Sequence, residues 1–131
     1  MDLTVTDSPD TVADTLIQAY RDGDDDTYLA RLAPDATLVL PGEPRHDAAD
    51  AYRAYLRTLR VRNGHRVLDA TSANRRVRYY GDTAVLTHDL TSVLERDAAI
   101  DTVTERETIV FARDTYGFWV AVHVHRSPLA A

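Results

Sequence analysis

The sequence contains no cysteine, no lysine and no long apolar run. Without cysteine the chain has no disulfide framework, no thiol nucleophile and no thiolate metal site. No apolar run approaches the roughly 18 residues of a membrane-spanning helix, so we expect no transmembrane segment. Residues 1–10 are polar and acidic, unlike the basic and then apolar start of a secretory signal, so the expected location is the cytoplasm.

Positive charge is also scarce. The 15 basic residues are outnumbered by 21 acidic ones, which gives a net charge of -6 at pH 7. Nucleic acids and anionic membrane surfaces attract clustered positive charge, so neither is expected as a partner. All basic residues are arginine and most acids are aspartate. That bias suits a salt-rich cytoplasm and equally suits a GC-rich genome, and composition does not separate the two.

What is present fits one α+β domain over residues 1–131, since 44% of the residues are apolar and can form a core. Ser8-Pro9 is typical of a helix start, because serine caps and proline fits the first turn, and Gly23 predicts the end of that helix. A second helix is expected over 25–32 and a short strand over 36–40. Asp47 is expected to cap a third helix that ends at Asn63-Gly64.

From Arg66 onward the apolar period changes to two, which predicts four long strands. Their expected ranges are 67–80, 83–95, 100–113 and 118–126. The short connections suit hairpins, so the strands form an antiparallel meander. Strands of this length must twist. The predicted fold is therefore three N-terminal helices packed on a strongly curved, mostly antiparallel sheet, shaped as a half-open cone.

Alternation along the strands sorts their side chains into two faces. Three polar residues, His88, Glu107 and Arg126, fall in otherwise apolar sets, which we assign to the concave face against the helices. The apolar members are Ala84, Leu86, Leu90, Ile109, Phe111, Val120, Val122 and Val124. Tyrosines expected to meet this face are Tyr20, Tyr52, Tyr55 and Tyr79. The opposite face carries Thr108, Trp119, His123 and His125, a mixture that suits packing on a second sheet in a symmetric homodimer.

The stretch Arg106-Glu-Thr-Ile-Val-Phe-Ala-Arg-Asp, followed by Trp119 and His123-Val-His-Arg-Ser-Pro128, resembles the last hairpin of SnoaL-like proteins of the NTF2-like superfamily. It is also similar to the association domain of calcium/calmodulin-dependent kinase II. Ala33-Pro-Asp-Ala-Thr37 is similar to a segment common in NTF2-like proteins. The resemblance implies a homodimer or larger ring with a pocket inside the cone. It implies no single activity, because the superfamily includes isomerases, cyclases, hydratases, dehydratases and non-catalytic association modules.

The sequence departs from two patterns of these relatives. Leu40 stands near the position of the carboxylate base of ketosteroid isomerases, and Leu16 near that of their helix tyrosine. Leu90 and Ile109 stand where association domains carry pocket arginines, whereas Arg126 matches the arginine of the final strand. These departures argue against isomerase chemistry and for a pocket with one cation.

Three functions remain as alternatives. The first is a binder of a small apolar molecule, in which Arg126 fixes a polar end; its expected pocket residues are Tyr20, Tyr52, Tyr55, Tyr79, Leu86, Leu90 and Ile109. The second is an enzyme with His88 or Glu107 as base. The third is a non-catalytic association module, in which His88, Glu107 and Arg126 form a buried structural cluster. No cofactor is predicted, and His123 with His125 lacks a clear third ligand, so no metal site is predicted either.

Overall fold

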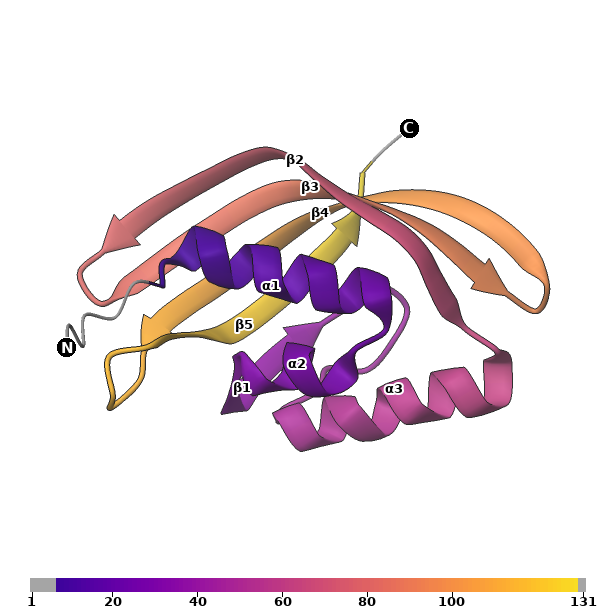
Figure 1. Ribbon diagram of the computed structural model, residues 1–131, viewed down its shortest axis with the longest axis horizontal. Helices are drawn as coiled ribbons and strands as arrows, with labels where there is room; N and C mark the ends of the chain where they lie inside the picture. The colour runs from indigo at the N-terminus through magenta and orange to yellow at the C-terminus, as the bar shows by residue number, and fades with distance from the viewer. Residues whose placement is uncertain (1–6, 130–131) are drawn as a thin grey trace, which may run out of the picture.

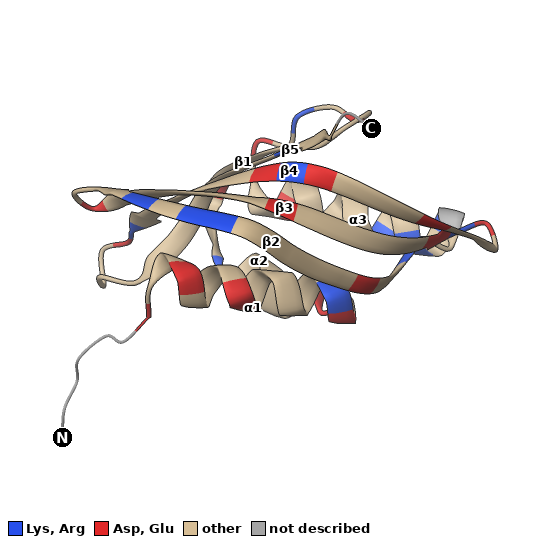
Figure 2. Ribbon diagram, turned by 90° about the horizontal axis from the view of Figure 1, so that it is seen from above, with Lys and Arg blue, Asp and Glu red and all other residues tan. Residues whose placement is uncertain are grey.

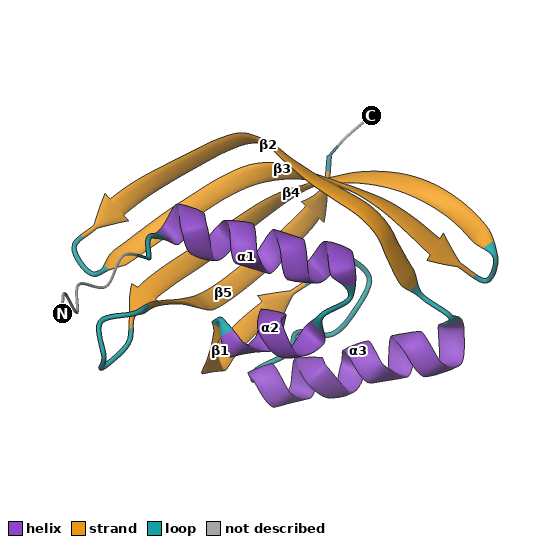
Figure 3. Ribbon diagram, in the orientation of Figure 1, coloured by secondary structure: helices purple, strands orange, loops and turns teal. Residues whose placement is uncertain are grey.

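The computed structural model describes residues 7–129, which form three helices and five strands. The helices are α1 (Pro9–Asp22), α2 (Asp25–Ala30) and α3 (Ala49–Asn63), and the strands are β1 (Leu32–Val39), β2 (Arg66–Tyr80), β3 (Thr83–Arg96), β4 (Ala99–Arg113) and β5 (Trp119–Pro128). The sheet order is β1-β5-β4-β3-β2, with β1 parallel to β5 and the other pairs antiparallel. The helices lie on one side of the curved sheet (Figures 1 and 3). This confirms the predicted fold class.

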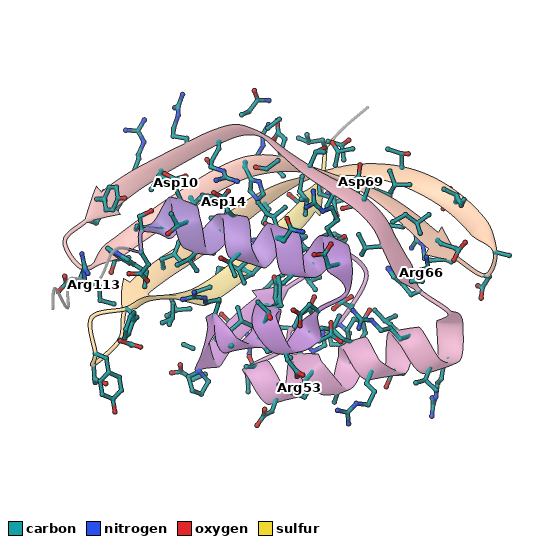
Figure 4. The ribbon with its side chains drawn as sticks, viewed as in Figure 1. Asp10, Asp14, Arg53, Arg66, Asp69 and Arg113 are labelled. Atoms are coloured by element: carbon teal, nitrogen blue, oxygen red, sulfur yellow. The ribbon has the colours of Figure 1, made fainter. Side chains whose placement is uncertain are left out.

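The first helix begins and ends as its sequence predicts. The hydroxyl of Ser8 accepts a hydrogen bond from the Thr11 amide at 3.2 Å, and the Thr11 hydroxyl accepts one from the Ser8 amide at 2.8 Å. Gly23 ends α1 in the left-handed conformation, at φ 70°. Arg75 of β2 then ties the helix to the sheet, with Nη1 2.7 Å from Oδ1 of Asp14. Asp10 and Asp14 are seen on α1 in Figure 4.

The third helix begins differently from the prediction. Its N-cap is Ala48, which supplies no side-chain hydrogen bond, so the expected cap at Asp47 is wrong. Asp47 instead pairs with Arg45, whose Nε lies 2.6 Å from Oδ1. Because the residue at the N-cap is alanine, whose side chain has no acceptor, the first turn of α3 lacks a side-chain cap.

The second helix ends earlier and the first strand begins earlier than predicted. The Arg31 carbonyl accepts a hydrogen bond from the Ala121 amide at 2.9 Å, and Leu32 is in register with Ala121. Pairing with β5 therefore replaces the expected last turn of α2. The register of β1 is irregular between Leu32 and Thr37, which accommodates Pro34, a residue that cannot donate to the sheet.

A bulge in β5 reverses the predicted faces of its first half. Val110 pairs with His123, but Phe111 pairs with Ala121, so one extra residue of β5 is inserted between these pairs. Trp119 is consequently buried in the core, 3% exposed, and the prediction that it lies on the outer face is wrong. Ala121 is likewise fully buried, whereas Val120 between them is only half-buried at the edge of the core. Beyond the bulge, Val124 and Arg126 are buried as predicted.

The helices leave part of the long sheet uncovered. The β3–β4 hairpin extends past them (Figure 1), and Ile100 near its tip is 61% exposed. Between residues 7 and 129, no helix has both the length and the apolar character needed to cross a membrane.

Candidate functional site

The concave side of the sheet has an open cleft of about 660 Å³ next to α3. The helix contributes Tyr52, Tyr55, Leu56 and Leu59 to one wall, because these residues recur at helical spacing. The β3–β4 hairpin contributes Leu94 and Val103 to the other wall. These two walls are therefore apolar and aromatic, whereas other parts of the cleft lining are charged. Figure 1 shows that α3 lies apart from α1 on the helical side of the sheet.

Arg126 lies at the floor of this cleft. Its side chain is 8% exposed, and its guanidinium carbon lies 4.6 Å from the centroid of the Tyr20 ring. Tyr28 and Tyr52 also line the cleft, and burial raises the pKa of both hydroxyls, so both are neutral at pH 7. The hydroxyl of Tyr20 hydrogen bonds to the buried Ser92 hydroxyl at 2.9 Å. The floor thus combines one buried cation with fixed aromatic rings.

Behind the floor, Arg126 belongs to a chain of buried hydrogen bonds. Its Nε donates to Glu107 Oε2, while Glu107 Oε1 lies 2.7 Å from His88 Nε2. His88 Nδ1 in turn lies 2.7 Å from the Ser72 hydroxyl. The sheet register explains the contacts, because Glu107 is paired with His88 on one side and with Arg126 on the other. The three residues predicted to share the concave face therefore do meet.

This arrangement also determines the charge of Glu107. Burial alone would raise the pKa of its carboxyl, but the charge of Arg126 and the hydrogen bond from His88 outweigh burial and lower the pKa to about 2. Both carboxylate oxygens are occupied, and the residue is 2% exposed. His88 is 1% exposed and is not part of the cleft lining. The cluster has the geometry of the structural alternative: an ion pair supported by a histidine.

The structure separates the residues predicted to form the pocket. Arg126, Tyr20, Tyr52 and Tyr55 line the cleft. Leu90 and Glu107 line a separate pocket of about 10 Å³, too small for a ligand. Three predicted pocket residues lie outside both: Leu86 and Ile109 are fully buried in the core, and Tyr79 is 56% exposed.

Tyr79 lies at the far end of the sheet because β2 continues beyond the cleft. Its ring centroid is 6.0 Å from that of Trp119, and Trp119 also stacks under the guanidinium of Arg113 at 4.5 Å. Figure 4 shows Arg113 at the opposite end of the molecule from Arg66, where α3 joins β2. Tyr79 is therefore not a residue of this site.

Most of the cleft lining was missed from the sequence, including Tyr28 and Glu105 beside Arg126. Nothing in the spacing of Tyr28 on the second helix indicated the cleft. Glu105 precedes Glu107 by two residues, so strand alternation places it on the same face and could have identified it. Glu105 lines the cleft and is 9% exposed. Burial raises the pKa of its carboxyl, Glu107 adds to the rise, and Arg126 opposes it.

The mouth of the cleft carries charges of both signs. Arg60 lies 2.7 Å from Asp25 and donates to the Gly23 carbonyl at 3.0 Å. Burial lowers the pKa of His65, and the nearby Arg96 and Arg60 lower it further. The mouth is therefore neither a purely cationic nor a purely anionic surface.

Of the four residues predicted for the dimer interface, three lie on the outer face of the sheet and the fourth, Trp119, does not. Thr108 pairs with His125, and the His123 and His125 rings lie 6.2 Å apart. The Nδ1 of His123 is 2.6 Å from the hydroxyl of Thr37. This face keeps Thr108, His123 and His125 but not Trp119.

The chain matches one protein-family model and several solved structures. The family model described as the calcium/calmodulin dependent protein kinase II association domain matches residues 10–130. Comparison with curated proteins gave no match.

Several solved structures resemble the chain. The CaMKII hub of S. rosetta is 25% identical, with a TM-score of 0.76 over 95% of this chain and 100% of that one. A ketosteroid isomerase-like protein from Erwinia carotovora atroseptica SCRI1043 is 14% identical, with a TM-score of 0.83 over 93% and 94%. An NTF2-like protein of unknown function in nutrient uptake from Rhodospirillum rubrum ATCC 11170 is 21% identical, with a TM-score of 0.79 over 95% and 100%.

Proposed function

Because the chain belongs to the calcium/calmodulin dependent protein kinase II association domain family and has the NTF2-like fold, we propose that it is a self-associating domain that binds a small, largely apolar molecule. Arg126 would hold a carboxylate at one end of that molecule. The observation that carries the proposal is the cleft of about 660 Å³ with a buried arginine at its floor. Cleft volumes of roughly 300–1,000 Å³ are typical of small-molecule sites.

The contacts of Arg126 prepare it for this role. Glu107 uses the Nε of Arg126, and an arginine has further N–H groups that can form paired hydrogen bonds with a carboxylate. The ring of Tyr20 and the ion pair hold the guanidinium in place, so little side-chain entropy is lost on binding. Glu107 also neutralises part of the arginine's charge, which limits the affinity for an anion. The apolar walls from α3 would then supply much of the binding energy.

Catalysis by His88 or Glu107 has less support than binding. A general base must be within hydrogen-bond reach of the substrate and have a pKa near the working pH. His88 lies outside the cleft lining, and the pKa of Glu107 is about 2. The enzyme alternative would therefore need a base other than these two residues.

Self-association is proposed through the outer face of the sheet, which includes Thr108, His123 and His125. The family model and the similarity to the S. rosetta hub support it. Half-buried Val110 lies beside Thr108 on β4 and adds apolar area. We expect sedimentation equilibrium to give at least the mass of a dimer, and Thr108→Arg to shift the mass toward the monomer. A monomer mass for the unaltered protein at micromolar concentration would contradict this proposal.

The binding proposal is tested by calorimetric titration with 3-phenylpropionate and with its uncharged amide. We expect the acid to bind more tightly, because the amide cannot form a charged pair with Arg126. The double variant Glu107→Gln/Arg126→Met should lose this preference and still fold, since both buried charges are removed together. Arg76→Met, at an exposed arginine of β2, should keep it. Equal binding of acid and amide, or an unchanged preference in the double variant, would refute the role of Arg126.

A further inference from the structure

The carboxyl of Glu105 lies at the cleft floor, and a ligand with only a carboxylate has no donor group to form a hydrogen bond with it. The residue is 9% exposed and lines the cleft. Within residues 7–129, no side chain or amide forms a hydrogen bond with this carboxyl. In the same part of the chain, its oxygens are not among the fully enclosed polar atoms that lack a partner. The oxygens therefore face the open space of the cleft.

Glu105 and Arg126 lie beside each other on neighbouring strands. Glu105 is in register with Pro128, and Glu107 with Arg126, so the two side chains are offset by one pair on the same face. Figure 2 shows the alternating acidic, basic and acidic positions of β4 at this point, which are Glu105, Arg106 and Glu107. Since Arg126 pairs with Glu107, the floor presents a partly used donor next to an unused acceptor.

A ligand with a carboxylate alone would fit this floor poorly. Its charge would join those of Glu105 and Glu107 around the buried cation Arg126. Of the more distant charges, Arg96 at the mouth lowers the pKa of the Glu105 carboxyl and Glu43 raises it by less, so Glu107 is the main anion acting on this carboxyl. A hydrogen-bond donor on the ligand, placed next to its carboxylate, would reduce this repulsion and satisfy Glu105.

We propose that the cleft selects a polar end in which a carboxylate stands next to a hydroxyl or ammonium group, with the carboxylate on Arg126 and the neighbouring donor on Glu105. This inference rests on the proposed function and specifies its ligand class as hydroxy acids and amino acids with an apolar tail. It assigns Glu105 as a specificity-determining residue, whereas Arg126 accounts for the anion.

The test uses three probes with one carbon skeleton: 3-phenylpropionate, phenyllactate and phenylalanine. They carry hydrogen, hydroxyl and ammonium next to the carboxylate. In calorimetric titrations at pH 7, we expect the unaltered protein to bind phenyllactate and phenylalanine about tenfold more tightly than 3-phenylpropionate, the size of one charge-assisted hydrogen bond. Glu105→Met should abolish both preferences.

Two further variants separate charge from hydrogen bonding. Glu105→Gln keeps an acceptor without charge, so the preference for phenyllactate should persist and that for phenylalanine should fall. Glu95→Met removes an acid of β3 outside the cleft lining and should change neither preference. Thermal unfolding of each variant confirms that it is folded under the titration conditions.

The outcomes separate this inference from the function on which it rests. If 3-phenylpropionate binds through Arg126 and the other two probes bind no better, the ligand class is wrong and the carboxylate site stands. If the preferences exist but survive Glu105→Met, another residue sets them and the role of Glu105 is refuted. If the folded protein binds none of the three probes, both the proposed site and its specificity are refuted.

Discussion

Two glutamates on one face of β4 differ because one lies in a sealed part of the molecule and the other in an open part. Glu107 is held between His88 and Arg126, and the pKa of its carboxyl is lowered to about 2. Glu105, two residues earlier, lines the cleft, and burial raises the pKa of its carboxyl. Residue type and strand face are therefore insufficient to assign a role. The partners that surround the carboxyl decide whether it supports the fold or meets a ligand.

The difference between the two parts follows from the helices. Beneath α1, Leu16, Leu86 and Ile109 fill the space between helix and sheet, each 1% exposed or less. Next to α3, Leu56 and Leu59 line a cleft and do not seal it. The sealed part should thus respond to small changes in volume or charge, whereas the cleft wall should tolerate them.

The largest expected loss of stability comes from removing one charge of the buried Glu107–Arg126 pair. Glu107→Gln leaves Arg126 buried without its anion and should lower the free energy of unfolding by about 3–5 kcal/mol. Urea denaturation measures this change. The double variant Glu107→Gln/Arg126→Met should recover most of the loss, because no uncompensated charge remains. A cost below about 1 kcal/mol for the single variant would show that water reaches the pair and that this part is not sealed.

The next largest effect is the difference in stability lost when a core leucine and a cleft-wall leucine are each replaced by alanine. Leu86→Ala, at a side chain with no exposed surface, should cost roughly 2–5 kcal/mol, because it leaves a cavity in a filled core. Leu56→Ala removes the same carbons from the cleft wall and should cost less than about 1.5 kcal/mol, since solvent already reaches that side. Both values come from urea denaturation at one pH. Equal costs would contradict the division into a sealed and an open part.

The smallest effect is a difference in pH dependence between the two glutamates. The pKa of Glu107 is lowered from 4.5 to about 2, so its stabilisation is complete above about pH 4.5 and is lost as the pH falls toward 2. Glu105 acts in the opposite direction, because its raised pKa gives stability that is present at low pH and is lost as the pH rises through the folded value.

Unfolding free energies from pH 2.5 to 7 test this contrast. The double variant Glu107→Gln/Arg126→Met should show a smaller loss in acid than the unaltered protein. Glu105→Gln should leave the acid loss in place and gain relative stability near neutral pH. An unchanged acid profile in the double variant would mean that other carboxylates, among them surface aspartates, govern acid unfolding.

Much of the fold was predictable because local signals agree with it. Ser8, Gly23 and the period-two pattern gave the first helix and the four long strands within a few residues. One error arose where a tertiary contact overrode the local pattern. Arg31 and Leu32 pair with β5 and so leave the helix, and this distant partner cannot be recognised from the spacing of residues alone. The other error was local, because α3 begins one residue later than expected and Asp47 pairs with Arg45.

The site was predicted less completely for two physical reasons. Alternation assumes a regular strand, so the β5 bulge placed Trp119 on the wrong face, while Arg126 beyond the bulge was placed correctly. Alternation also shows which face of the sheet a side chain is on, but it does not show which helix covers that part of the strand. His88, Leu86 and Ile109 share the face of the cleft but lie under α1, whereas Glu105 and Tyr52 lie beside its opening. Which stretch of a strand a helix covers depends on packing across the whole chain.

The position of β5 has a consequence for how the protein is made. This strand follows the other four in the chain, yet it lies between β1 and β4 and joins residues that are far apart in sequence. While the ribosome is still producing β4, the N-terminal strand has no neighbour to pair with, and Glu107 has no arginine. Completion of the sheet and neutralisation of its buried acid should therefore occur together as a late event after synthesis of Arg126, which favours release of a whole domain over stepwise folding.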